Sequence, residues 1–191
     1  RLDEALESYD SALRINPNYA EAYSNRGNVL KDLKRLDEAL ESHDSALRIN
    51  PNYAEAYSNR GNVLKDLKRL DEALESYDSA LRINPNYAEA YSNRGIVLKD
   101  LKRLDEALES YDSALRINPN YAEAYSNRGN VLKDLKRLDE ALESHDSALR
   151  INPNYAEAYS NRGNVLKDLK RLDEALESYD SALRINPNYA E

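Results

Sequence analysis

The chain of 191 residues contains no cysteine and no methionine. The absence of cysteine excludes a disulfide framework and a metal site built on thiolates. The absence of methionine means that Arg1 is not a natural start, so we interpret the sequence as a segment of a longer protein. The sequence also has no long apolar run and no signal-like start, and it therefore predicts no membrane span and no targeting segment.

Positive charge is not concentrated in any part of the sequence. The 27 Lys and Arg residues are outnumbered by 35 Asp and Glu residues, which gives a formal net charge of -8, and both signs are spread evenly. A protein without a basic patch cannot neutralise a run of phosphates. We therefore expect neither nucleic acid nor an anionic membrane as a partner.

What the sequence does contain is a repeat with a fixed step of 34 residues. Full blocks cover residues 17–50, 51–84, 85–118, 119–152 and 153–186. They differ at two positions, of which one reads His43, Tyr77, Tyr111, His145, Tyr179 and the other reads Asn28, Asn62, Ile96, Asn130, Asn164. A fixed period of this length is typical of a solenoid, in which each unit contacts only its neighbours. We expect a single solenoid domain over residues 1–191.

Each block predicts two helices. Apolar and small residues form one stripe along residues 19–34 and a second stripe along residues 36–49. Asn18 and Glu21 resemble a capping box at the start of the first helix. Residues 1–16 correspond to the second helix of a truncated repeat, and residues 187–191 correspond to the start of another. The prediction is therefore eleven helices and no strands.

The residues shared by the blocks resemble the tetratricopeptide repeat: Tyr23-x2-Arg26-Gly27-x2-Leu30, then Ala39-x3-His43, then Ala46 and Pro51. The resemblance implies an all-α fold, a right-handed α-α superhelix of antiparallel helix pairs whose first helices line the inner face. It also implies a binding scaffold, because this family consists of scaffolds with many unrelated partners.

Without the apolar stripe, the first helix retains Glu21, Asn25, Asn28 and Asp32 on one face, at the spacing i, i+4, i+7, i+11. A carboxamide offers donors and an acceptor, so a row of them can pair with the backbone of an extended peptide. The repeat arm of the O-linked N-acetylglucosamine transferase is similar in carrying inner-face asparagines at the place of Asn25. The alternatives are that the amides only solvate the inner wall or hydrogen-bond to the next repeat. The candidate ligand-binding residues are Asn25, Asn28, Asn59, Asn62, Asn93, Asn127, Asn130, Asn161 and Asn164.

Four further residues of the first helices refine this hypothesis. Members of the family that grip a terminal carboxylate use inner-face Lys and Arg, whereas this sequence has Ser24 and Glu21 at those places, so we expect no such grip. Ile96 interrupts the row of amides once, and we interpret it as an unselected substitution rather than an apolar foothold for a ligand. Arg26 replaces the usual Leu, and we expect it to pair with Asp44 or Asp10 on an adjacent second helix.

The histidines predict packing and not chemistry. Ser42, His43 and Asp44 cannot form a triad, because adjacent helical residues point in different directions. His43 and His145 are on the order of 30 Å apart if each layer is ~10 Å thick, so they cannot share a metal ion. All five glycines fall inside the expected helices, which excludes a phosphate-binding loop. We expect no catalytic residue, no metal and no cofactor.

These observations favour a non-enzymatic scaffold that binds a protein or peptide ligand on its inner face. A second hypothesis is a structural array that stacks head to tail into a continuous superhelix, since no polar capping repeat covers its ends. A third is the recognition arm of a larger enzyme whose catalytic domain lies outside this sequence. A cytoplasmic location fits each of the three.

Overall fold

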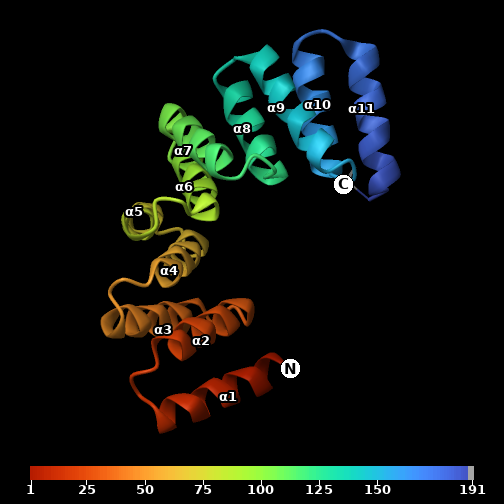
Figure 1. Ribbon diagram of the computed structural model, residues 1–191. Helices are drawn as coiled ribbons and strands as arrows, with labels where there is room; N and C mark the ends of the chain where they lie inside the picture. The colour runs from red at the N-terminus through yellow and green to blue at the C-terminus, as the bar shows by residue number, and fades with distance from the viewer. Residues whose placement is uncertain (189–191) are drawn as a thin grey trace. The chain divides into compact units, whose positions relative to one another are not determined.

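The computed structural model describes residues 1–188, which form helices joined by short turns and contain no strand (Figure 1). As predicted, this part of the chain contains eleven helices. The second helices of the repeats are α1 (Leu2–Ile15), α3 (Leu36–Ile49), α5 (Leu70–Ile83), α7 (Leu104–Ile117), α9 (Leu138–Ile151) and α11 (Leu172–Ile185). The first helices are α2 (Ala20–Asp32), α4 (Ala54–Asp66), α6 (Ala88–Asp100), α8 (Ala122–Asp134) and α10 (Ala156–Asp168). The predicted start of a further repeat at 187–191 lies largely outside the described residues.

The second helices have the predicted bounds, whereas the first helices are shorter than the predicted 19–34. They stop early because Lys34 adopts the left-handed conformation, with φ of 62°. The N–H of Arg35 then donates to the carbonyl of Leu30 over 2.9 Å, and the N–H of Lys34 donates to the carbonyl of Lys31 over 2.9 Å. This is a Schellman motif, which satisfies the last carbonyls of the helix. A lysine occupies the position that glycine most often takes.

The predicted capping box is wrong. The N-cap residue of α2 is Tyr19, and no side chain caps that helix. The amide that acts locally is instead Asn16, whose Oδ1 accepts a hydrogen bond from the backbone N–H of Asn18 over 3.2 Å. This Asx turn around Pro17 positions the chain between the two helices.

Within a repeat, the first and second helices approach so closely that only glycine fits at the crossing. A Cβ atom added to Gly27 would lie 2.6 Å from Nε2 of His43, and one added to Gly61 would lie 2.7 Å from Cε1 of Tyr77. Glycine inside a helix costs about 1 kcal/mol relative to alanine. The packing of the aromatic ring against the helix backbone offsets that cost.

Between repeats, small and aromatic side chains fill the junction. Ala46 and Leu47 of α3 pack with Ala56 of α4, and Tyr53 and Tyr57 cover them. The same arrangement recurs one repeat later around Ala80, Leu81 and Ala90. Each junction therefore buries the face of one second helix under the next first helix.

The contacts divide the chain into two compact units, Arg1–Val97 and Leu98–Glu191. In the first unit each of α1 to α4 packs on the next helix, and α2 also contacts α4. In the second unit each of α7 to α10 packs on the next helix, and α8 also contacts α10. Each unit is thus an all-α solenoid of helix pairs, as predicted. The single domain over residues 1–191 stays a prediction.

Candidate functional site

The first helices of neighbouring repeats lie next to each other within each unit, and they carry the predicted asparagines. Asn25 is exposed, and the others are half-buried. Apart from Asn62 and Asn164, their carboxamides make no hydrogen bond to any residue between Arg1 and Asn188. Most of the row therefore has free donors and acceptors at the surface. The residues of this amide row are Asn25, Asn28, Asn59, Asn62 and Asn93 in the first unit, and Asn127, Asn130, Asn161 and Asn164 in the second.

Two members of the amide row have a partner inside their own repeat. The hydroxyl of Tyr77 donates to Oδ1 of Asn62 over 2.7 Å, and the hydroxyl of Tyr179 donates to Oδ1 of Asn164 over 2.9 Å. The amide N–H groups of both asparagines remain available. The sequence analysis did not predict these hydrogen bonds, although each of them joins the two positions at which the repeats differ.

Lys31, next to the amide row, is already paired with the following repeat. Its Nζ lies 3.9 Å from Oδ2 of Asp66 on α4. Nearby, Ser24 is buried and forms a hydrogen bond with Tyr53. Burial raises the pKa of Tyr53, and the negative charge of Glu55 raises it further, whereas the hydrogen bond to Ser24 lowers it. Ser24 and Lys31 thus tie α2 to the next repeat.

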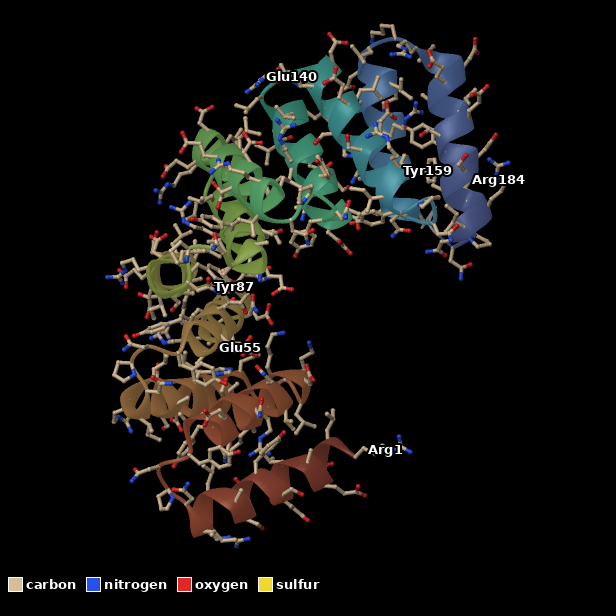
Figure 2. All side chains as sticks on the ribbon, viewed as in Figure 1. Arg1, Glu55, Tyr87, Glu140, Tyr159 and Arg184 are labelled. Carbon is tan, nitrogen blue, oxygen red and sulfur yellow. The ribbon has the colours of Figure 1, made fainter. Side chains whose placement is uncertain are left out.

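Carboxylates lie on the same face as the amide row. Glu21 and Asp32 of α2 are exposed, and so are Glu55 and Asp66 of α4 (Glu55 is labelled in Figure 2). Each first helix except α6, where Ile96 replaces the second amide, therefore presents two amides between two carboxylates.

On the opposite side of the first helices, an arginine joins two second helices, as predicted for Arg26. Its Nε donates to Oδ1 of Asp10 over 2.7 Å, and its Nη1 donates to Oγ of Ser42 over 3.3 Å. Asp44, the other expected partner, binds Arg60 of the next repeat over 2.6 Å. The same bond recurs at Arg94–Asp78, Arg128–Asp112 and Arg162–Asp146. The arginines therefore have a structural role.

Each unit also has an open cleft between second helices, which the sequence analysis missed. In the first unit it measures about 390 Å³, and in the second about 370 Å³. Tyr57 lines the first cleft and Tyr159, labelled in Figure 2, lines the second. The residues that line each cleft come from three consecutive helices, so no local sequence pattern could have predicted the clefts. The first cleft is lined by Asp44, Leu47, Arg48, Tyr57, Arg60, Glu75, Ser76 and Ser79.

The histidines are packing residues, as predicted. His43 and His145 are fully buried, and burial lowers the pKa of each to about 4. Neither of their ring nitrogens has a hydrogen-bond partner among residues 1–188. Ser42 donates to the carbonyl of Tyr23, and Asp44 accepts from Arg60. Ser42, His43 and Asp44 therefore point in three different directions and form no catalytic triad. No group of His, Asp and Glu in the described chain could hold a metal ion.

None of the helices formed by residues 1–188 is both long enough and apolar enough to cross a membrane.

Comparison with known families matches the chain to tetratricopeptide repeat models along its length. The model of the TPR repeat matches residues 1–34, 27–68, 61–102, 97–136 and 129–170, and the model of the tetratricopeptide repeat matches residues 156–189. No curated protein matches the chain.

Solved structures give the same result. YrrB, a TPR protein with an unusual peptide-binding site, is 30% identical, with a TM-score of 0.75 over 96% of this chain and 95% of YrrB. TTC0263, a thermophilic TPR protein of Thermus thermophilus, is 29% identical, with a TM-score of 0.73 over 89% of this chain and 93% of its own. MamA of Desulfovibrio magneticus RS-1 is 21% identical, with a TM-score of 0.79 over 90% and 97%, and this likeness concerns the fold alone.

Proposed function

The chain belongs to the tetratricopeptide repeat family, whose members act as protein-interaction scaffolds, and we propose that it binds an extended peptide segment along the amide row. The observation that carries the proposal is the set of surface carboxamides without internal partners. YrrB, which is similar over nearly its full length, has a peptide-binding site, and this supports the proposal.

The chemistry of the amide row suits a peptide backbone. Every residue of an extended peptide except proline has one N–H donor and one carbonyl acceptor that need partners. Each asparagine offers two donors and a carbonyl oxygen. Asn62 and Asn164 have already accepted a hydrogen bond, so they act mainly as donors toward the ligand. The part of the recognition that the amides contribute depends little on the ligand's side chains.

The test replaces Asn59, Asn93 and Asn127 together with alanine. None of the three carboxamides makes a hydrogen bond to other residues that the structure describes, so the fold should keep its thermal midpoint. Peptides selected from a random library against the native chain should lose binding to this variant, as measured by fluorescence anisotropy. Unchanged binding would remove the amide row from the function.

A matched control uses three asparagines outside the amide row. Asn52, Asn86 and Asn120 are exposed in the turns between repeats, and within residues 1–188 only their backbone N–H groups form hydrogen bonds. Their joint replacement with alanine changes the same number of carboxamides. Peptide binding should stay at the native level.

A second candidate function is end-to-end assembly of copies of this chain. On α11, Leu176 is 63% exposed and Leu183 is 38% exposed, whereas the equivalent Leu40 and Leu47 on α3 are covered by the next repeat. An exposed apolar face of this kind is typical of an interaction surface. Sedimentation across a wide range of protein concentrations tests this assembly. A mass that rises without a plateau supports stacking if Leu176→Lys abolishes the rise, whereas a constant mass near 21.8 kDa excludes stacking.

A role as recognition arm of a larger enzyme stays a prediction.

A further inference from the structure

The carboxylates beside the amide row are exposed at regular intervals. In the first unit they are Glu21 and Asp32 on α2 and Glu55 and Asp66 on α4. In each helix the glutamate precedes the two asparagines and the aspartate follows them, all on one face. The amide row therefore has carboxylates along both of its sides.

The cations of the same helices balance only half of this negative charge. Arg26 and Arg60 are bound to Asp10 and Asp44 on the second helices, away from the amide row. Of the cations within these two helices, Lys31 and Lys65 remain near the face, and Lys31 is paired with Asp66; Lys34 and Lys68 lie beyond the helix ends, in the turns. Four carboxylates on α2 and α4 thus face two ammonium groups. A ligand along the amide row meets a surplus of negative charge.

The spacing of the repeats adds a period to this charge. Successive first helices are ~10 Å apart, as for packed helices in general. A polyproline II chain, the common extended form of a peptide, advances about 3.1 Å per residue and completes a turn in three residues. Every third side chain of such a ligand therefore returns to the same side after about one repeat.

We propose that the amide row selects an extended cationic peptide with Lys or Arg at every third residue, whose side chains pair with Glu21, Glu55 and their equivalents. This inference rests on the proposed function, because it assumes that the amides hold the backbone. It adds the chemical class of the ligand and the spacing of its charges.

The test uses four fluorescein-labelled peptides of equal length on the native chain. The first is Lys-Ser-Ser repeated four times, the second replaces each Lys with Glu, and the third replaces each Lys with Gln. The fourth has the same composition as the first, with its lysines in one block. The first peptide should bind tightest in fluorescence anisotropy at low salt. Equal affinity for the first and the fourth overturns the spacing, and equal affinity for the first three overturns the charge preference.

Matched variants separate the effect of the carboxylates beside the amide row from the effect of the net charge of the whole chain. Replacing Glu21, Glu55 and Glu89 with glutamine should weaken the first peptide by up to about fivefold for each carboxylate. Glu41, Glu75 and Glu109 are exposed on the second helices. Replacing these three with glutamine removes the same charge and should change the affinity for the first peptide little. An equal loss in both variants would mean non-specific attraction and would overturn the inference.

The two proposals fail in different ways. If library-selected peptides depend on Asn59, Asn93 and Asn127 but show no excess of Lys or Arg at every third residue, the proposed function holds and this inference is wrong. If the selected peptides do not depend on these asparagines, both fail. The loss of affinity between low and physiological salt gives an independent readout of the charge contribution.

Discussion

The repeats at 17–50 and 51–84 differ only where one has His43 and the other has Tyr77. Both rings are fully buried against the backbone of Gly27 or Gly61. Tyr77 extends far enough to donate its hydroxyl to Asn62, whereas the ring nitrogens of His43 have no partner in the described chain. The same fold therefore accepts either residue, and the difference is an unsatisfied buried polar group, which costs about 1–3 kcal/mol.

Acid should separate the two kinds of repeat most strongly. Burial lowers the pKa of His43 and His145 from 6.5 to about 4, so the folded chain binds fewer protons than the unfolded chain. The stability that depends on neutral histidine is complete above pH 6.5 and is lost as the pH falls toward 4. At pH 4.5 we expect a loss of about 2–3 kcal/mol for each histidine. Urea unfolding at pH 7 and pH 4.5 measures it.

The control for this acid effect is the double variant His43→Tyr/His145→Tyr, which keeps every carboxylate. It should lose less stability than the native chain over the same pH range. An equal loss in both proteins would assign the acid sensitivity to carboxylates and would contradict the depressed histidine pKa.

Alanine at the helix crossing tests whether the two rings pack equally tightly. Gly27→Ala and Gly61→Ala place a methyl group within 3 Å of the ring of His43 or Tyr77. Overpacking of this kind costs about 1–3 kcal/mol, against the gain that alanine gives in a free helix. Both variants should lower the urea midpoint by similar amounts. A stabilised Gly27→Ala variant would show that the His43 repeat is the looser one.

Conversion of the His43 repeat into the Tyr77 repeat should stabilise it. At pH 7, His43→Tyr removes unsatisfied nitrogens and supplies a hydroxyl for Asn28, with an expected gain of about 1–2 kcal/mol. In a double-mutant cycle with Asn28→Ala, part of this gain should disappear. If the gain does not depend on Asn28, the bond between Tyr77 and Asn62 is not what distinguishes the repeats.

Among the tyrosines, Tyr111 provides the finer test. Its hydroxyl is buried and has no partner in the described part of the chain, and the residue 15 positions earlier is Ile96, which has no acceptor. Tyr77→Phe should therefore cost about 1 kcal/mol, whereas Tyr111→Phe should be neutral or stabilising. Thermal unfolding of the two variants measures the difference. Equal costs would mean that the bond to Asn62 contributes nothing.

Glycine in place of the lysine with positive φ should have the smallest effect on stability, and the effect should be equal in both repeats. Lys34 and Lys68 have φ of 62° and 61°, a conformation that glycine adopts without strain. Lys34→Gly and Lys68→Gly should each stabilise the chain by about 1 kcal/mol or less. Differential scanning calorimetry measures the shift. A destabilised variant would show that the lysine side chain stabilises the turn.

Most of the fold could be predicted because its determinants are local. The helical period, the Asn50-Pro51 stop and the 34-residue step all lie within one repeat of the sequence. The capping box failed because the pattern of Asn18 and Glu21 also fits a turn in which Asn16 binds the chain instead. The cleft around Tyr57 was missed because its residues lie on three helices.

By itself, the sequence determined the repeat, the number and order of the helices, the buried stripe and the amides on the opposite face. These properties follow from periodicity and residue type along one helix. Only the tertiary structure decided that Arg26 binds Asp10 and Ser42, that Tyr77 engages Asn62, and that Lys31 reaches Asp66. Those choices depend on how far one helix stands from the next and how it is rotated about its axis, and these quantities arise only when the helices pack.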